Sequence, residues 1–142
     1  MKNIRYYILF AIIACTTACS RSFEPFDYGK EECTFCKMTI VDPRYSAEII
    51  DKKGKIYKFD DIACMKHYMV DNKMQENDLN TFVSAFRPKN TILDAQKAFF
   101  IQNEYFKSPM KGNTAAFDKE NDAKTLNDSL HASIVSWSAL RF

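Results

Sequence analysis

The sequence predicts an α+β fold in which two similar ββα-type units pack into one small domain. The observation behind this prediction is a repeat. The segment 57–60 (YKFD) precedes one helical pattern, and the segment 115–118 (AAFD) precedes another, 58 residues further along the chain. Each copy reads as a strand ending in Phe, an Asp cap and a helix. The alternative is coincidence, since Asp is a common helix cap.

The first unit is predicted to contain a hairpin and a helix. Residues 46–50 and 55–59 have the composition of strands, and the Asp and Gly of 51–54 are typical of the turn between them. A helix is expected from about 61 to 72, with one of the aspartates at 60–61 as its cap. The apolar residues that recur at helical spacing are Ile62, Met65 and Met69.

The chain after the first helix is predicted to contain further strands and the second helix. Strands are expected at 81–86, 98–106 and 114–117, and a closing strand is expected at 132–137. Asp118 is the expected cap of the second helix. The helical face consists of Ala123, Leu126 and Leu130.

The first 18 residues have the pattern of a signal peptide. Lys2 and Arg5 precede the apolar run 6–14, and small residues follow it. This run is too short for a membrane-spanning helix, which needs about 20 apolar residues. The TTAC sequence ending at Cys19 resembles a lipobox, and the overlapping IIAC ending at Cys15 is the alternative.

Lipidation at Cys19 would anchor the chain to a membrane without a spanning helix. The predicted organisation is therefore a lipoprotein signal peptide at 1–18, a lipidated tether at 19–30 and a metal-binding domain at 31–142. The expected location is the periplasmic side of the bacterial cell envelope.

Charge and composition exclude several classes of function. Without residues 1–18 the chain has 18 basic and 18 acidic residues, so it lacks the positive charge that nucleic-acid binding requires. Only three glycines are present, which excludes a glycine-rich phosphate loop. The sequence contains no Ser/His/Asp set and no supported pair of catalytic carboxylates, so we expect a binding protein and not an enzyme.

The strongest local signal is Cys33-Thr-Phe-Cys36-Lys-Met38. A C-x-x-C turn brings two thiols within reach of one metal, and Met38 adds a thioether. Such soft ligands favour Cu(I). Two alternatives stay open: a plain disulfide between Cys33 and Cys36 with Met38 in the core, and a thiol oxidoreductase that uses the same cysteine pair.

A second signal is Cys64-Met-Lys-His67, at the start of the predicted helix. At 100° per residue, Cys64 and His67 lie about 60° apart and away from the apolar face. Together with Cys33 and Cys36 they would form a Cys3His zinc site in a structural interaction module. They could instead contribute to a copper site. The simplest alternative is a small buried cysteine and a surface histidine.

The loop 108–112 (SPMKG) holds Met110 outside regular structure, where its thioether could reach a metal.

These motifs, taken together, resemble the NosL family of lipoproteins that accompany nitrous oxide reductase. The matching segments are the lipobox, Cys33-x-x-Cys36-x-Met38, 42–44 (DPR), 54–62 (GKIYKFDDI), 108–110 (SPM) and 115–117 (AAF). They extend from about residue 31 to 137. One departure is Lys37, where the family commonly has Gly.

The resemblance implies a Cu(I)-binding chaperone with a fold of two similar ββα-containing units. It implies Cys36, Met38 and Met110 as copper ligands, with Cys33 as a further candidate. The implied recipient of copper is nitrous oxide reductase, and the copper donor is unknown.

Overall fold

The computed structural model describes residues 22–142. The predicted signal peptide and both candidate lipidation sites, Cys15 and Cys19, lie outside the described residues. Among residues 22–142, no helix has the length and apolar character needed to cross a bilayer.

The first unit is built on an antiparallel sheet with the strand order β2-β1-β3-β4. The predicted hairpin is confirmed, with Glu48 of the central strand opposite Lys58 of its neighbour. The strand β4 was not predicted from the sequence, because it has only three residues. The strands are β1 (Ala47–Ile50), β2 (Ile56–Phe59), β3 (Asn80–Ser84) and β4 (Ile92–Asp94).

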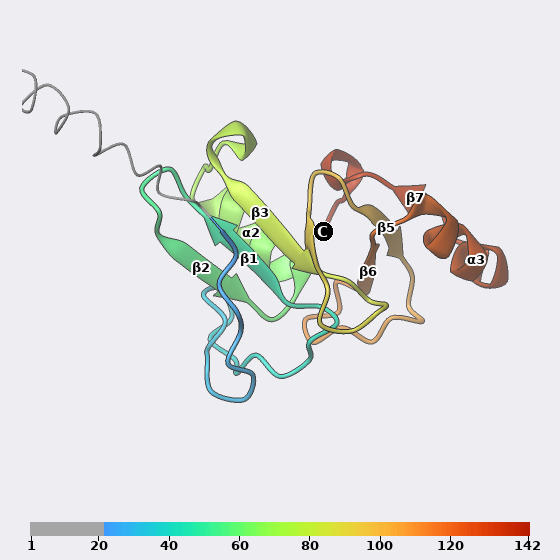
Figure 1. Ribbon diagram of the computed structural model, residues 1–142, viewed down its shortest axis with the longest axis horizontal. Helices are drawn as coiled ribbons and strands as arrows, with labels where there is room; N and C mark the ends of the chain where they lie inside the picture. Colours follow the sequence, from blue (N-terminus) through green and yellow to red (C-terminus); the bar gives the residue numbers. More distant parts are fainter. Residues whose placement is uncertain (1–21) are drawn as a thin grey trace, which may run out of the picture.

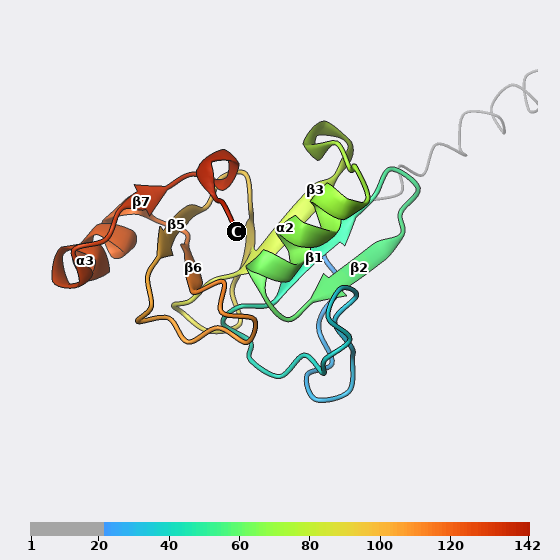
Figure 2. The ribbon, with the colours of Figure 1, turned by 180° about the vertical axis from the view of Figure 1, so that it is seen from behind.

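Helix α2 (Ile62–Asp71) covers one face of this sheet (Figure 2). Asp61 is its N-cap, and the Asp61 side chain accepts a hydrogen bond from the backbone N–H of Ala63. The helix buries the predicted apolar face of Ile62, Met65 and Met69. It buries Cys64 as well, although helical spacing had placed Cys64 away from that face. The short 3-10 helix η1 (Glu76–Asp78) leads into β3.

The second unit repeats the topology of the first. β5 (Phe99–Gln102) is the central strand, paired antiparallel with β6 (Thr114–Phe117) and β7 (Ile134–Val135). Helix α3 (Glu120–Leu130) follows β6 as α2 follows β2. Each unit therefore contains the order ββαβ with its first strand between the other two, and the first unit adds β4 at the edge of its sheet. This confirms the predicted α+β fold of two similar units.

Several boundaries in the second unit differ from those predicted. The strand expected at 98–106 ends at Gln102, where a long loop begins, and the closing strand has two residues and leads into the 3-10 helix η2 (Trp137–Ala139). Lys119, and not Asp118, occupies the N-cap position of α3, without a side-chain hydrogen bond. The helix thus begins one residue later than the aspartate indicated.

The two units are joined by backbone and side-chain contacts. Ala85, just after β3, forms a parallel bridge with Ala116 of β6, and the Phe86 N–H donates to the Ala116 carbonyl at 2.8 Å. Trp137 packs on Phe100, and both belong to the core cluster that contains the α2 residues. Figure 1 shows the two sheets side by side, with α3 at the far end of the molecule.

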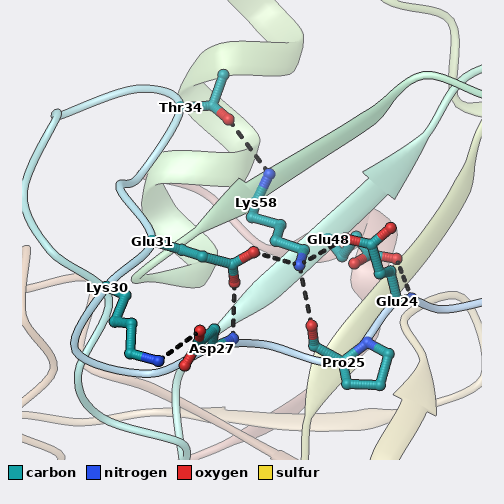
Figure 3. Close-up of polar contacts among 8 residues, drawn as sticks. All are labelled: Glu24, Pro25, Asp27, Lys30, Glu31, Thr34, Glu48 and Lys58. Atoms are coloured by element: carbon teal, nitrogen blue, oxygen red, sulfur yellow. Dashed lines mark hydrogen bonds and ion pairs between the residues drawn. The ribbon is translucent and has the colours of Figure 1, made fainter.

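The segment before residue 31 is part of the folded domain. It crosses the sheet face opposite α2 (Figure 1). The ammonium group of Lys58 donates to the Pro25 carbonyl at 2.9 Å and pairs with Glu24 and Glu31, while the Glu24 N–H donates to buried Glu48 (Figure 3). The folded domain therefore begins earlier than the predicted boundary at residue 31, and residues 24–30 are not a free tether.

Candidate metal site

Three thiols and one carboxylate converge beside the N-terminus of α2. The sulfurs of Cys33, Cys36 and Cys64 and a carboxylate oxygen of Asp60 all lie within 4.8 Å of one another. Cys33, Cys64 and Asp60 are buried, and Cys36 is partly exposed. The set comes from three elements: the loop before β1, the end of β2 and the first turn of α2.

Backbone hydrogen bonds shape the cysteine loop. The Cys33 N–H donates to the Met38 carbonyl at 2.8 Å, and the Lys37 N–H donates to the Cys33 carbonyl at 3.0 Å. Lys37 adopts a positive φ of 65°, a conformation that favours glycine. The Thr34 N–H donates to the Lys58 carbonyl at 2.7 Å, which fixes the loop against β2. The turn thus holds both cysteines close to Asp60.

Asp60 is a member of this cluster that sequence reasoning used only as a candidate helix cap. The Cys36 thiol donates to Asp60 Oδ1 at 3.4 Å, whereas Asp60 Oδ2 has no hydrogen-bond partner among the described residues. The side chain is buried, so this oxygen is withdrawn from water without compensation. A signal in the sequence was available: Asp60 ends a strand two residues before the helix begins.

The three thiols have different proton affinities. The Cys64 thiol donates a hydrogen bond to the Cys33 sulfur, which lowers the pKa of Cys33 to about 6. The same bond raises the pKa of Cys64, and burial raises the pKa of Cys36 to about 11. Cys36 and Cys64 therefore hold their protons more tightly than Cys33, and a metal that binds all three sulfurs must displace those protons.

Met110 lies on a loop that is attached to α2. The Ser108 hydroxyl and the Met110 N–H both donate to Asp61 Oδ2, at 2.6 and 2.9 Å. A Cβ on Gly112 would lie 2.6 Å from both Ala63 Cβ and Asp61 Oδ1, so the loop backbone is in close contact with the helix. The long loop between β5 and β6 of the second unit therefore contacts the N-terminus of α2, beside which the thiol cluster of the first unit lies.

The two methionines are more exposed than the cysteines. Met38 is 48% exposed and Met110 is 39% exposed, whereas Cys33 and Cys64 are fully buried. The soft sulfur donors therefore range from buried Cys33 and Cys64 to exposed Met38 and Met110, with partly exposed Cys36 between these extremes of exposure. Thiolate and thioether ligands of this kind select Cu(I) over hard cations.

His67 lies outside the group of four. Its side chain is exposed, and its ring stacks on Phe35 with centroids 5.7 Å apart and lies edge-on to Phe142 at 6.2 Å. The structure therefore does not assemble the Cys3His set considered as the zinc alternative. The fourth member of the group, beside the three cysteines, is Asp60.

The cysteine pair also lacks the features of a thiol oxidoreductase. Cys33, Cys36 and Cys64 are all free thiols. A redox-active pair exposes its low-pKa thiol to the substrate. Here the thiol with the lowered pKa is fully buried Cys33, and the more accessible Cys36 has a raised pKa.

Comparison with known proteins gives consistent matches over the folded part of the chain. The NosL family model matches residues 28–140. The chain is 28% identical over 115 residues to the copper-binding lipoprotein NosL of Stutzerimonas stutzeri, across 75% of this chain and 60% of that relative's length. The crystal structure of the copper chaperone NosL from Shewanella denitrificans has a TM-score of 0.72 at 15% identity, covering 84% of this chain and 95% of that structure. The fold is therefore shared with a solved structure of that description.

Proposed function

Because this chain belongs to the NosL family, we propose that it is a Cu(I)-binding chaperone, held by a lipid on the periplasmic side of a bacterial envelope membrane. The names of its relatives, a copper-binding lipoprotein and a copper chaperone, support this proposal. Family membership also supports a protein that binds and transfers a metal and not an enzyme. The proposed recipient is nitrous oxide reductase, and the copper comes from a donor that the chain does not identify.

One observation carries the proposal. The neighbouring residues Asp60 and Asp61 hold two loops that bear soft ligands, because Asp60 accepts the Cys36 thiol and Asp61 accepts the Met110 N–H. We propose Cys36, Met38 and Met110 as the ligands from which copper is transferred, with Cys33 as a further ligand. His67 is not included, because its ring is occupied by stacking on Phe35.

The exposure of the Met38 and Met110 thioethers supports a role in copper transfer. A partner's ligand has to reach the bound ion before the chaperone's own ligands leave it. Met38 and Met110 present their side chains to solvent, so the ion they hold is open to such attack. Thioethers are neutral and need no proton when the ion departs.

The direct test is a Cu(I) titration of the reduced chain under anaerobic conditions, against a colorimetric competitor. We expect tight binding of one Cu(I), with affinity several-fold weaker in Met110→Ala. Val41→Ala is the matched control, since Val41 is exposed but offers no ligand. Stoichiometric zinc retained from expression and unaffected by Met110→Ala would instead favour a structural zinc site.

Delivery is tested separately, by mixing the copper-loaded chain with copper-free nitrous oxide reductase. We expect reductase activity to return, and to return more slowly with Met110→Ala. Recovery at the rate given by free Cu(I) would contradict a role in delivery.

The lipid anchor is tested by expression in a bacterium that processes lipoproteins. We expect the chain to fractionate with membranes and to incorporate a labelled fatty acid. Cys19→Ala should abolish both properties, and Cys15→Ala should leave both unchanged. The reverse result would move the lipidation site to Cys15.

A further inference from the structure

We call the buried sulfurs of Cys33 and Cys64 the inner layer and the exposed Met38 and Met110 the outer layer, and we count partly exposed Cys36 in both. Cys33 and Cys64 lie in the core at 0% exposure, whereas Met38 and Met110 lie at the surface. Copper transfer requires only the outer layer. In that step the buried sulfur of Cys64 has no role, and the buried sulfur of Cys33 is only a further ligand.

The inner sulfurs are close enough to bind one ion. Two sulfurs that each lie about 2.3 Å from one metal are about 4 Å apart. The sulfurs of Cys33, Cys36 and Cys64 already lie within 4.8 Å of one another, so small side-chain movements would bring them onto one ion. The backbone is held on both sides of the cluster: the Cys33 N–H donates to the Met38 carbonyl, and Cys64 lies in a capped helical turn.

Asp60 provides an independent indication of a cation. Its Oδ2 is buried and has no hydrogen-bond partner within residues 22–142, and an uncompensated buried carboxylate oxygen is unfavourable. The nearby ammonium groups bond elsewhere: Lys58 to Pro25, Glu24 and Glu31, and Lys37 to the Thr34 carbonyl. A cation among the three sulfurs would supply the missing positive charge.

We propose that Cys33, Cys36 and Cys64 form an inner three-sulfur position for Cu(I), with the Asp60 carboxylate beside it. This inference rests on the proposed copper-binding function and extends it. Thiolates bind Cu(I) more strongly than thioethers, so the inner position holds the ion at rest. Cys36 belongs to both layers. When a partner binds, the ion stays bound to Cys36 and passes from the inner cysteines to Met38 and Met110.

The test compares Cys64→Ser with Met110→Ala in the full chain, purified in detergent, reduced and kept anaerobic. Serine keeps the size and the hydrogen-bond donor of Cys64 but removes the soft ligand. We expect Cys64→Ser to lower Cu(I) affinity at least tenfold, to reduce the ultraviolet thiolate-to-copper absorption, and to release copper faster to a chelator. Met110→Ala should lower Cu(I) affinity less than Cys64→Ser does and should keep the thiolate-to-copper absorption. It should also release copper to the chelator more slowly than the unsubstituted chain.

Other results would overturn the inner position. Equal affinity and absorption in Cys64→Ser and the unsubstituted chain would confine copper to the outer layer. Loss of zinc, with copper binding unchanged, would make the inner cluster a zinc site. Failure of the unsubstituted chain to bind Cu(I) at all would instead refute the proposed function itself.

A second measurement needs no variant and covers the case in which Cys64→Ser does not fold. The unsubstituted chain is alkylated in mild denaturant, with and without one equivalent of Cu(I), and the modified cysteines are identified by mass spectrometry. We expect copper to protect Cys33, Cys36 and Cys64 to the same degree. Protection of Cys36 alone would overturn the proposal.

Discussion

The two ββαβ units share a topology but differ at the start of their helices. α2 and α3 begin 58 residues apart, at Ile62 and Glu120. At the same offset, Asp61 corresponds to Lys119, and Cys64 corresponds to Asp122. In the first unit an aspartate caps the helix, and a thiol lies in its first turn. The second unit has neither, so the cluster of three thiols and Asp60 lies in the first unit.

The connections between the first two strands of each unit also differ. In the first unit β1 and β2 are joined by a short turn in which Asp51 accepts the N–H groups of Lys53 and Lys55. In the second unit the loop between Gln102 and Thr114 reaches the N-terminus of α2. The first unit thus contains the thiol cluster, and the second unit provides an extended loop that places Met110 beside the N-cap of α2.

The largest effect is expected from Asp61→Ala. This change removes the cap of α2 and the acceptor for Ser108 and Met110. Loss of a cap and of two charged hydrogen bonds should lower the free energy of unfolding by about 4 kcal/mol. This loss is measured by unfolding both proteins in denaturant. The corresponding change in the second unit, Lys119→Ala, should alter stability by less than about 0.5 kcal/mol, and equal losses would contradict the comparison.

Gly112→Ala should separate the loop from the helix. The added methyl group would collide with Ala63 and Asp61, which are parts of a packed helical turn. We expect a loss of about 3 kcal/mol in unfolding free energy and weaker Cu(I) binding. Gly54→Ala in the short turn is the matched control: its φ of +82° adds about 1 kcal/mol of strain without a collision, and copper affinity should stay unchanged.

A pH-dependent stability should arise in the first unit. Burial raises the pKa of Glu48 to about 7 from its usual value of 4.5, while its counterpart in the central strand of the second unit is Phe100. Between these two pH values the folded chain binds a proton that the unfolded chain lacks. The free energy of unfolding should therefore fall by about 2 kcal/mol as pH rises from 4.5 to 7, with little further change from this group above 7.

Thermal or denaturant unfolding across that pH range provides the measurement. Glu48→Gln should flatten this part of the profile, because glutamine does not titrate. Glu104→Gln is the control, since Glu104 is an exposed residue of the β5–β6 loop and should leave the slope in place. A slope that persists in Glu48→Gln would assign it to another group.

The smallest expected effect is an increase in the free energy of unfolding. Lys119 occupies the N-cap position of α3 with extended backbone and no side-chain hydrogen bond. Lys119→Ser would supply the missing acceptor and should stabilise the chain by about 1 kcal/mol. Lys119→Ala removes the same cation without adding a cap, so no comparable gain is expected. Equal behaviour of the two variants would show that charge, and not capping, decides the result.

The sequence by itself determined the local elements and the types of donor atom. The hairpin at the start of the first unit, the α2 helix with its apolar face and the repeat spacing all follow from neighbouring residues. Those signals are local, because strand alternation, turn residues and caps act within a few positions. The soft donors of the cysteine loop and Met110 were recognised for the same reason.

The tertiary structure decided which of those donors meet. Ser108 and Met110 contact Asp61 across 47 and 49 residues, and no local pattern specifies such contacts. Long-range packing also buried Cys64, added Asp60 to the thiols and left His67 stacked on Phe35. The physical reason is that burial and hydrogen-bond pairing depend on the relative positions of whole elements, which are set by the packing of the two units.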